Sequence, residues 1–185
     1  ARRSVGRRRS WYRDYVETQI QRDVRDLARI HSLDAMPKLL AVAAAQTARI
    51  INVADLAAPF EMTRQTIHDY VTLLERVFLL DALPAWHSNR LSRLVKRSKL
   101  HMADTGVACA LLGVDAKGLD GDRELLGSML ETFALQELRR QASWHPDPPS
   151  FHHFRDRDGY EVDIVLERGR ALAGVEVKAA SSVST

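Results

Sequence analysis

The 185-residue sequence predicts an α+β protein, in which helices fill most of the first half of the chain and strands end it. In residues 11–78 apolar residues recur at steps of three and four, which is the spacing of one helix face. In residues 151–179 apolar and β-branched residues form short runs between turn signals, which is typical of strands. We therefore expect a basic tail or linker at 1–10, a helical domain at 11–98 and a strand-containing domain at 99–185.

The composition is that of an ordinary globular protein, with 45% apolar residues and a net charge of +3. The single cysteine, Cys109, excludes a disulfide framework and a cysteine-based zinc site. It favours a reducing compartment, so we expect a cytoplasmic protein. No stretch approaches the roughly 18 apolar residues of a membrane span, and the arginine-rich start lacks the apolar core of a secretory signal. We therefore expect no membrane partner.

Three helices are expected before residue 60. Residues 11–31 have helical spacing, and Ser10 stands where its hydroxyl can cap the first turn. The alanine-rich segment 39–50 predicts a second helix. Residues 53–58 predict a short third helix, which Pro59 closes.

A longer helix is expected after Thr63, a good N-cap, and a strand is expected at 78–83. The exposed residues of the first turns of this helix are Arg64, Gln65 and His68. Helix, short helix, turn, longer helix and strand is the order of a winged helix-turn-helix, in which these three residues would enter the major groove of DNA. Two alternatives stay open. The unit can be a protein-interaction module, or a sequence-specific regulator with no enzymatic role.

Basic residues gather in two runs. The first is the tail, which we expect to be a flexible linker. The second has no acid between His87 and Met102, and its members are Arg90, Arg93, Lys96, Arg97 and Lys99. A local positive field attracts nucleic acid even when the net charge is small, so the first four of these are candidate phosphate contacts. A solvated surface is the alternative for this run.

The second half begins with a predicted strand at 100–103 and a small helix after Asp104, followed by a loop at 113–121. A long helix is predicted at 122–140, and its apolar face includes Glu131. A carboxylate on that face is expected to be half-buried, so it needs a partner. The partner is either a lysine or arginine, or a metal site to which Glu131 contributes an outer acid.

Three strands are predicted at the end of the chain, at 151–155, 160–167 and 171–179. Side chains alternate between the two faces of a strand, so Glu176 and Lys178 would share one face and converge with Asp163. Two carboxylates suit a divalent cation, and an ammonium can orient a water. That combination indicates a metal-dependent phosphodiesterase site. The alternative is an ordinary half-exposed hairpin, which also alternates charged and apolar residues.

Several short motifs occur in a fixed order that resembles a known family. They include Arg22-Asp23-Val24, Thr66-Ile67-His68-Asp69, Asn89-Arg90-Leu91, Asp104-Thr105-Gly106, Leu130-Glu131-Thr132-Phe133, Glu161-Val162-Asp163 and Glu176-Val177-Lys178. Together they resemble the C-terminal accessory module of a prokaryotic AAA-type ATPase family, catalogued as domain of unknown function 4143. The resemblance extends from about residue 11 over nearly the whole chain.

The resemblance implies a winged-helix part followed by a restriction-endonuclease-like α/β part of the PD-(D/E)XK type. Glu131, Asp163, Glu176 and Lys178 match the four signature positions of that nuclease fold. Asp163 and Glu176 would hold Mg²⁺ with the Val177 carbonyl, Lys178 would position the attacking water, and Glu131 would bind an outer water or a second ion. A catalytically inactive module that interacts with a protein partner or regulates the ATPase is the alternative.

The resemblance also implies partners outside this sequence. No Gly-x-x-x-x-Gly-Lys-Ser/Thr motif is present, so ATP would bind only in an ATPase domain that precedes residue 1. The nuclease-like part is expected to continue after Lys178, so we expect a C-terminal truncation. The other expected partner is nucleic acid, most simply DNA.

Overall fold

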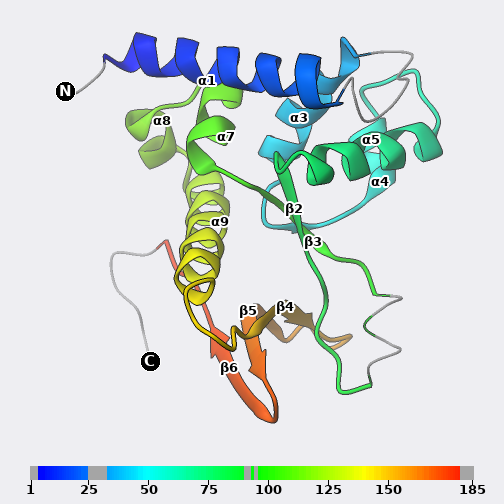
Figure 1. Cartoon of the computed structure of the whole chain (residues 1–185), viewed down its shortest axis with the longest axis vertical. Coiled ribbons are helices and arrows are strands. Elements are labelled where there is room, and N and C mark those ends of the chain that lie inside the picture. Colours follow the sequence, from blue (N-terminus) through cyan, green and yellow to red (C-terminus); the bar gives the residue numbers. More distant parts are fainter. Residues whose placement is uncertain (1–3, 25–32, 90–92, 94–95, 180–185) are drawn as a thin grey trace.

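The computed structural model describes residues 4–24, 33–89, 93 and 96–179, which form helices and two antiparallel three-stranded sheets. The predicted α+β class is confirmed. The elements in chain order are α1 (Val5–Gln19), the π-helix η1 (Ile20–Val24), α3 (Ala35–Ala45), β1 (Arg49–Ile50), α4 (Val53–Ala57), α5 (Arg64–Arg76), β2 (Leu80–Leu83), β3 (Lys99–Met102), α7 (Thr105–Leu112), α8 (Ala116–Gly121), α9 (Arg123–Ala142), β4 (Ser150–Arg155), β5 (Glu161–Arg168) and β6 (Ala171–Val175). Figure 1 shows α1 across the end of the molecule opposite to β4, β5 and β6.

The first sheet has the strand order β1-β3-β2 and lies against α3 and α5, and α4 packs on these two helices. The predicted order of short helix, longer helix and strand is confirmed for α4, α5 and β2. Thr63 caps α5 as expected, because its hydroxyl accepts a hydrogen bond from Thr66 N at 3.1 Å. The antiparallel hairpin of β2 and β3 completes this unit.

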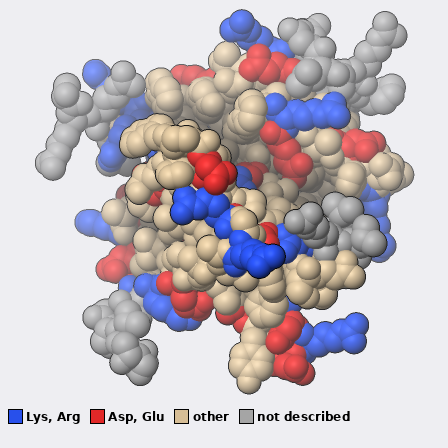
Figure 2. Space-filling model, turned by 60° about the horizontal axis from the view of Figure 1, so that its bottom comes forward, with Lys and Arg blue, Asp and Glu red and all other residues tan. Residues whose placement is uncertain are grey.

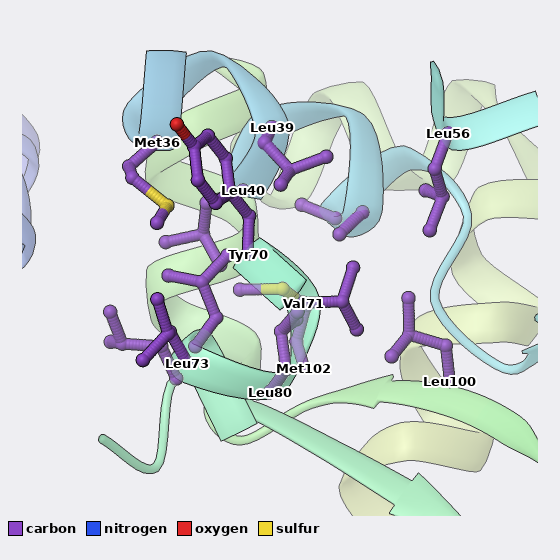
Figure 3. Close-up of a cluster of buried hydrophobic side chains, with 14 of the residues drawn as sticks. Met36, Leu39, Leu40, Leu56, Tyr70, Val71, Leu73, Leu80, Leu100 and Met102 are labelled. Atoms are coloured by element: carbon purple, nitrogen blue, oxygen red, sulfur yellow. The ribbon is translucent and has the colours of Figure 1, made fainter. Parts of the chain in front are cut away.

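A large apolar core fills the unit, as Figure 3 shows. Helices α3 and α5 each bury one face and strand β3 is buried on both, and the fully buried apolar side chains include Leu39, Leu40, Ile67, Leu74 and Met102. Helix α7 adds Val107 and Ala108 to the same cluster. Burial of this apolar surface is the main stabilising contribution in this half of the protein.

The second sheet has the order β4-β5-β6, and its core is small. Its fully enclosed apolar side chains are only Leu83, Leu135 and Ile164 among the described residues. The two sheets are joined where the chain leaves β2, because Trp86 N donates to the His153 carbonyl at 2.6 Å and His153 N donates to the Pro84 carbonyl at 2.9 Å. Helix α9 runs between the two halves (Figure 1).

The N-terminal region differs from the sequence prediction. Residues 5–10 are helical, and the N-cap is Ser4, whose hydroxyl accepts from Arg7 N, instead of Ser10. Arginine is a good helix former, so an arginine-rich run is compatible with a helix as well as with a linker. The predicted helix at 11–31 continues into the π-helix η1, and its end lies outside the described residues.

Further boundaries differ: the second predicted helix begins at Ala35 instead of residue 39, and the strand predicted at 78–83 begins at Leu80. The second predicted helix ends at Ala45, and Arg49–Ile50 forms β1 because it pairs with β3. The loop predicted at 113–121 contains α8, which Asp115 caps. Strand β6 ends at Val175, so Glu176 and Lys178 follow the strand instead of lying on it. None of the helices in the described ranges is long and apolar enough to cross a membrane.

Candidate functional site

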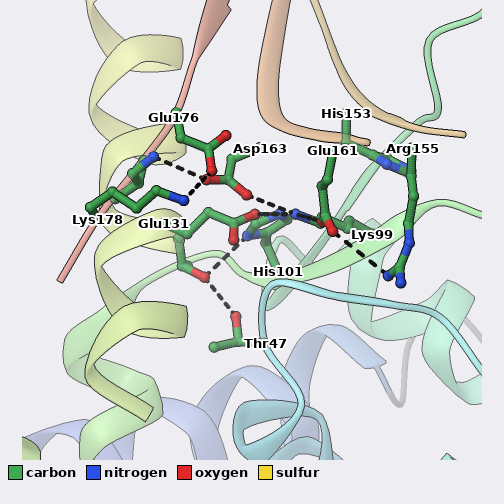
Figure 4. A network of polar contacts seen from close by, with 12 residues as sticks. Thr47, Lys99, His101, Glu131, His153, Arg155, Glu161, Asp163, Glu176 and Lys178 are labelled. Atoms are coloured by element: carbon green, nitrogen blue, oxygen red, sulfur yellow. Dashed lines mark hydrogen bonds and ion pairs between the residues drawn. The ribbon is translucent and has the colours of Figure 1, made fainter. Parts of the chain in front are cut away.

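The candidate site is a buried ion cluster centred on Lys99, the first residue of β3. Its ammonium Nζ lies 2.8 Å from Glu131 Oε1, 2.9 Å from Glu161 Oε1 and 3.3 Å from Asp163 Oδ1. Glu131 comes from α9, whereas Glu161 and Asp163 share one face of β5. Figure 4 shows the four side chains pointing toward one another, and we call them the Lys99 cluster.

Burial sets the electrostatics of the Lys99 cluster. Only 3% of the Lys99 side chain is exposed, which disfavours its charged form. The ion pairs with Glu131 and Glu161 outweigh this effect and raise the pKa of Lys99. Burial also raises the pKa of Glu131 to about 7, although Lys99 opposes the rise. Lys99 is shared among three carboxylates, and Arg155 adds a second cation only at the Glu161 end, 3.7 Å from Oε2, so Glu131 is incompletely compensated.

A second buried polar group lies beside the cluster. His101 on β3 is fully buried, and its Nδ1 lies 3.1 Å from Thr132 Oγ1. Its Nε2 has no hydrogen-bond partner among the described residues and lies 3.9 Å from Glu131 Oε1. Burial lowers the pKa of His101 to about 3, so the imidazole is neutral at pH 7.

The structure brings only part of the predicted site together. Glu131 and Asp163 meet at Lys99, so the expected partner of Glu131 is a lysine. Glu176 and Lys178 lie at the surface and pair with each other at 2.5 Å, with 45% and 56% of their side chains exposed. The link to the cluster is through the backbone, since Val177 N donates to Asp163 Oδ2 at 3.0 Å.

This geometry does not fit a magnesium ion as the residues stand. The two oxygens of Asp163 face Lys99 Nζ and Val177 N–H, and Glu176 faces Lys178. The Val177 group that points to Asp163 is a donor, which cannot bind a cation. Within the described part of the chain, no group of three or more His, Cys, Asp and Glu side chains is arranged to hold a metal. The ammonium of Lys99 occupies the position expected for the magnesium ion.

Two members of the cluster, Lys99 and Glu161, were missed as site residues by the sequence reasoning. Glu161 had a usable signal, because residues two apart on a strand share a face and Asp163 was already a candidate. The sequence signal for Lys99 was weaker: this lysine directly precedes the apolar run that begins at Leu100. Its place in a basic run favoured a surface position instead.

The predicted DNA-reading residues lie at the exposed start of α5. Gln65 Nε2 donates to Asp69 Oδ1 at 2.8 Å, and His68 Nδ1 lies 3.8 Å from the same oxygen. Arg64 lines an open groove together with Arg97. This groove, which we call the α5 groove, runs between the starts of α4 and α5 and the segment that leads into β3. Within the described residues, neither guanidinium has an ion-pair partner.

The basic run is divided by the structure. Arg93 forms a two-point ion pair with Glu167 and stacks on Trp86 at 5.4 Å from the ring centroid, so its charge faces the second sheet. Lys96 and Arg97 are exposed. Arg90 lies outside the described residues. On the face turned forward in Figure 2, basic and acidic side chains are interspersed.

Comparison with known proteins divides the chain into two matched regions. Residues 1–118 match the family described as Domain of unknown function (DUF8612). The chain belongs to this family. Residues 126–185 match a second one, Domain of unknown function (DUF4143), so the predicted family is confirmed for this region, whereas the motifs before residue 118 fall in the DUF8612 region. The DUF8612 region supplies Lys99, and the DUF4143 region supplies Glu131, Glu161 and Asp163, so the Lys99 cluster links the two.

Relatives of this DUF8612 protein occur in mycobacteria. It is similar to Uncharacterized protein Rv2008c of Mycobacterium tuberculosis and to Uncharacterized protein Mb2031c of Mycobacterium bovis. In both comparisons the identity is 25% over 175 residues, which cover 95% of this chain and 39% of the relative. The chain thus spans about two fifths of the length of these relatives. No solved structure matches it.

Proposed function

We propose that this chain is a nucleic-acid-binding module that contacts phosphates through the α5 groove. One observation supports this above the others: Arg64 and Arg97 come from separate elements and line the same groove, with no acid paired to either among the described residues. Lys96 is exposed next to Arg97 and extends the positive surface. Guanidinium groups free to form two parallel hydrogen bonds are well suited to phosphate.

The engaged and the free arginines differ in what they offer a ligand. Arg93 would have to lose its ion pair with Glu167 before it bound a phosphate, whereas Arg64 and Arg97 would lose only water. The contacts of Gln65 and His68 with Asp69 place a negative charge beside the reading positions. Backbone contact is therefore better supported than base reading by this helix.

Salt dependence tests the proposal. The measurement is the fluorescence anisotropy of labelled duplex and single-stranded DNA, titrated with protein between about 50 and 200 mM salt. If Arg64, Lys96 and Arg97 each neutralise one phosphate, the slope of log affinity against log salt is about −2 to −3. Arg64→Ala or Arg97→Ala reduces the magnitude of that slope by about 1.

Arg76→Ala is the matched control, because Arg76 is exposed in the last turn of the same helix, away from the groove. It leaves the slope unchanged. Affinity that does not respond to salt, or an equal loss in Arg76→Ala and Arg64→Ala, would contradict phosphate binding by the groove. Such a result would favour the alternative function, an interaction module that binds a protein partner.

For the Lys99 cluster the geometry favours a structural role over cleavage, since Lys99 Nζ stands among the acids that would bind Mg²⁺. The expected result of a cleavage assay with Mg²⁺ or Mn²⁺ is no cutting of either DNA. Metal-dependent cutting that is lost in Asp163→Ala would instead support the nuclease that the family resemblance implies. Attachment to an ATPase domain is part of the same proposal, because the curated relatives extend well past the matched region.

A further inference from the structure

We propose that the Lys99 ammonium is the resident cation of the carboxylate cluster, and that removing this ammonium converts Glu131, Glu161 and Asp163 into a divalent-cation site. The native protein would then need no metal at this position. The inference does not depend on nucleic-acid binding, because it concerns the joint between the two halves and not the α5 groove.

The number of N–H donors on the Lys99 ammonium equals the number of carboxylate oxygens around it. It has three N–H donors, and three carboxylate oxygens lie 2.8, 2.9 and 3.3 Å from Nζ. The backbone of Lys99 is fixed in the sheet, where it pairs with Ile50 of β1 on one side and Leu83 of β2 on the other, and only 3% of its side chain is exposed. A charge held this way excludes a second cation from the same oxygens.

The cluster has the chemistry of a cation site once the ammonium is gone. Three carboxylates converge from α9 and β5, and hard oxygen ligands are what Mg²⁺ and Mn²⁺ prefer. Charge favours the exchange, because Lys99 and Arg155, whose Nη1 lies 3.7 Å from Glu161 Oε2, supply two positive charges to three acids, and replacing the ammonium by a divalent ion raises that to three. Glu161 is the most exposed of the three, with 32% of its side chain accessible, and gives ions a route from solvent.

His101 is the independent observation that points to a ligand. Its Nε2 is fully buried, faces Glu131 at 3.9 Å and has no hydrogen-bond partner within the described chain. Buried ring nitrogens normally have a partner. In the tautomer whose Nδ1–H donates to Thr132 Oγ1, Nε2 carries a lone pair directed to the cluster, and such a neutral nitrogen is a common ligand of transition metals.

The test compares Lys99→Gln with Lys178→Gln. Both variants lose one ammonium, but Lys178 pairs with Glu176 at the surface. Mn²⁺ is titrated into each variant and into the wild type, with binding followed by calorimetry and by the electron paramagnetic resonance signal of free Mn²⁺. We expect one saturable site in Lys99→Gln, at least tenfold tighter than any binding to the wild type or to Lys178→Gln. We also expect its melting temperature to rise with Mn²⁺.

The following results would overturn or support the proposed cation site. Equal binding by all three proteins, or no binding by folded Lys99→Gln, overturns the proposal. So does tight binding by the wild type that Asp163→Asn removes. If Lys99→Gln is unfolded in chelator and folds when Mn²⁺ is added, the proposal is supported.

If Lys99→Gln stays unfolded in both conditions, the double variant Lys99→Gln/Glu131→Gln decides. It has one acid fewer to repel its neighbours, and Glu161 and Asp163 remain as ligands. Saturable Mn²⁺ binding by this variant supports the proposal, and its absence overturns it. None of these results changes the salt slope of DNA binding, so failure of this inference and failure of the proposed function are distinguishable.

Discussion

The two halves of the molecule are stabilised in different ways. The helical half encloses a large apolar core from α3, α5, β3 and α7, whereas the apolar cluster against β4, β5 and β6 has three fully enclosed side chains among the described residues, one each from β2, α9 and β5. The second half relies instead on ion pairs, of which the Lys99 cluster and the Arg93–Glu167 pair connect it to the β2–β3 hairpin.

This difference predicts how the stability of each half responds to substitutions. An apolar core loses stability in proportion to the contacts and volume removed. A buried ion cluster loses little if all of its charges are replaced together, but much if one partner is removed and the others stay charged. The first half should therefore respond gradually to substitution, and the joint between the halves should respond steeply.

The largest loss of stability is expected for Lys99→Gln. Removing one partner of a buried ion pair costs about 3–5 kcal/mol, and this variant removes the cation shared by Glu131 and Asp163 and leaves Glu161 with Arg155. Protonation of Glu131 limits the loss, because its pKa is already raised to about 7. Urea unfolding followed by tryptophan fluorescence measures the change at pH 7. A loss no larger than that of an exposed lysine, tested with Lys117→Gln, would show that the cluster does not hold the halves together.

The loss of stability expected for Leu74→Ala is nearly as large. Leu74 on α5 is fully buried in the first core, and truncating such a leucine costs about 2–5 kcal/mol. Hydrogen exchange distinguishes this loss from the previous one. Leu74→Ala should speed amide exchange in α3 and α5, whereas Lys99→Gln should speed it first in β4, β5 and β6. The same exchange pattern in both variants would mean that the halves unfold as one unit.

A pH effect of intermediate size is expected from Glu131. Its pKa is near 7 in the folded protein and near 4.5 when unfolded, so the folded state keeps a proton that the unfolded state releases. Stability contributed by Glu131 therefore falls as the pH rises from about 4.5 to 7. His101 acts in the opposite direction, because its folded pKa near 3 lies below its ordinary 6.5, so its contribution rises with pH over about 3 to 6.5.

Glu131→Gln separates the two contributions. Without the carboxyl, the rise due to His101 is no longer offset, so the stability of the variant relative to the wild type increases between pH 5 and 7 by on the order of 1–3 kcal/mol. Thermal or urea unfolding at several pH values measures it. Glu137→Gln, an acid on the same helix that pairs with Arg140, is the control and should run parallel to the wild type. A parallel curve for Glu131→Gln would contradict the raised pKa.

Much of the fold was predictable because it depends on local rules. The spacing of apolar residues located α5 and α9, and Thr63 marked the start of α5. The turn at 156–159 correctly predicted the pairing of β4 with β5. Local rules failed where tertiary pairing decides, as at Arg49–Ile50, which is a strand only because β3 lies beside it.

Part of the candidate site was predictable from local rules, and the rest depends on tertiary structure. Burial of Glu131 follows from its position on a helix face, and Asp163 follows from strand alternation. That Lys99 would be their partner depends on how the β2–β3 hairpin meets α9 and β5, and no sequence spacing carries that information. The convergence of Glu176 and Lys178 with Asp163 was predicted from a strand that continues to residue 179, but β6 stops at Val175.

The smallest effect is expected for Glu176→Gln, and it tests the comparison most directly. Glu176 was a predicted metal ligand, yet nearly half of its side chain is exposed and its ion pair with Lys178 lies in solvent, where such pairs contribute little. We expect no measurable change in the urea midpoint, whereas Asp163→Asn, which alters a buried acceptor of both Lys99 Nζ and Val177 N–H, lowers it clearly. Equal losses in the two variants would place Glu176 in the joint, and the distinction between a buried cluster and a surface pair would then be wrong.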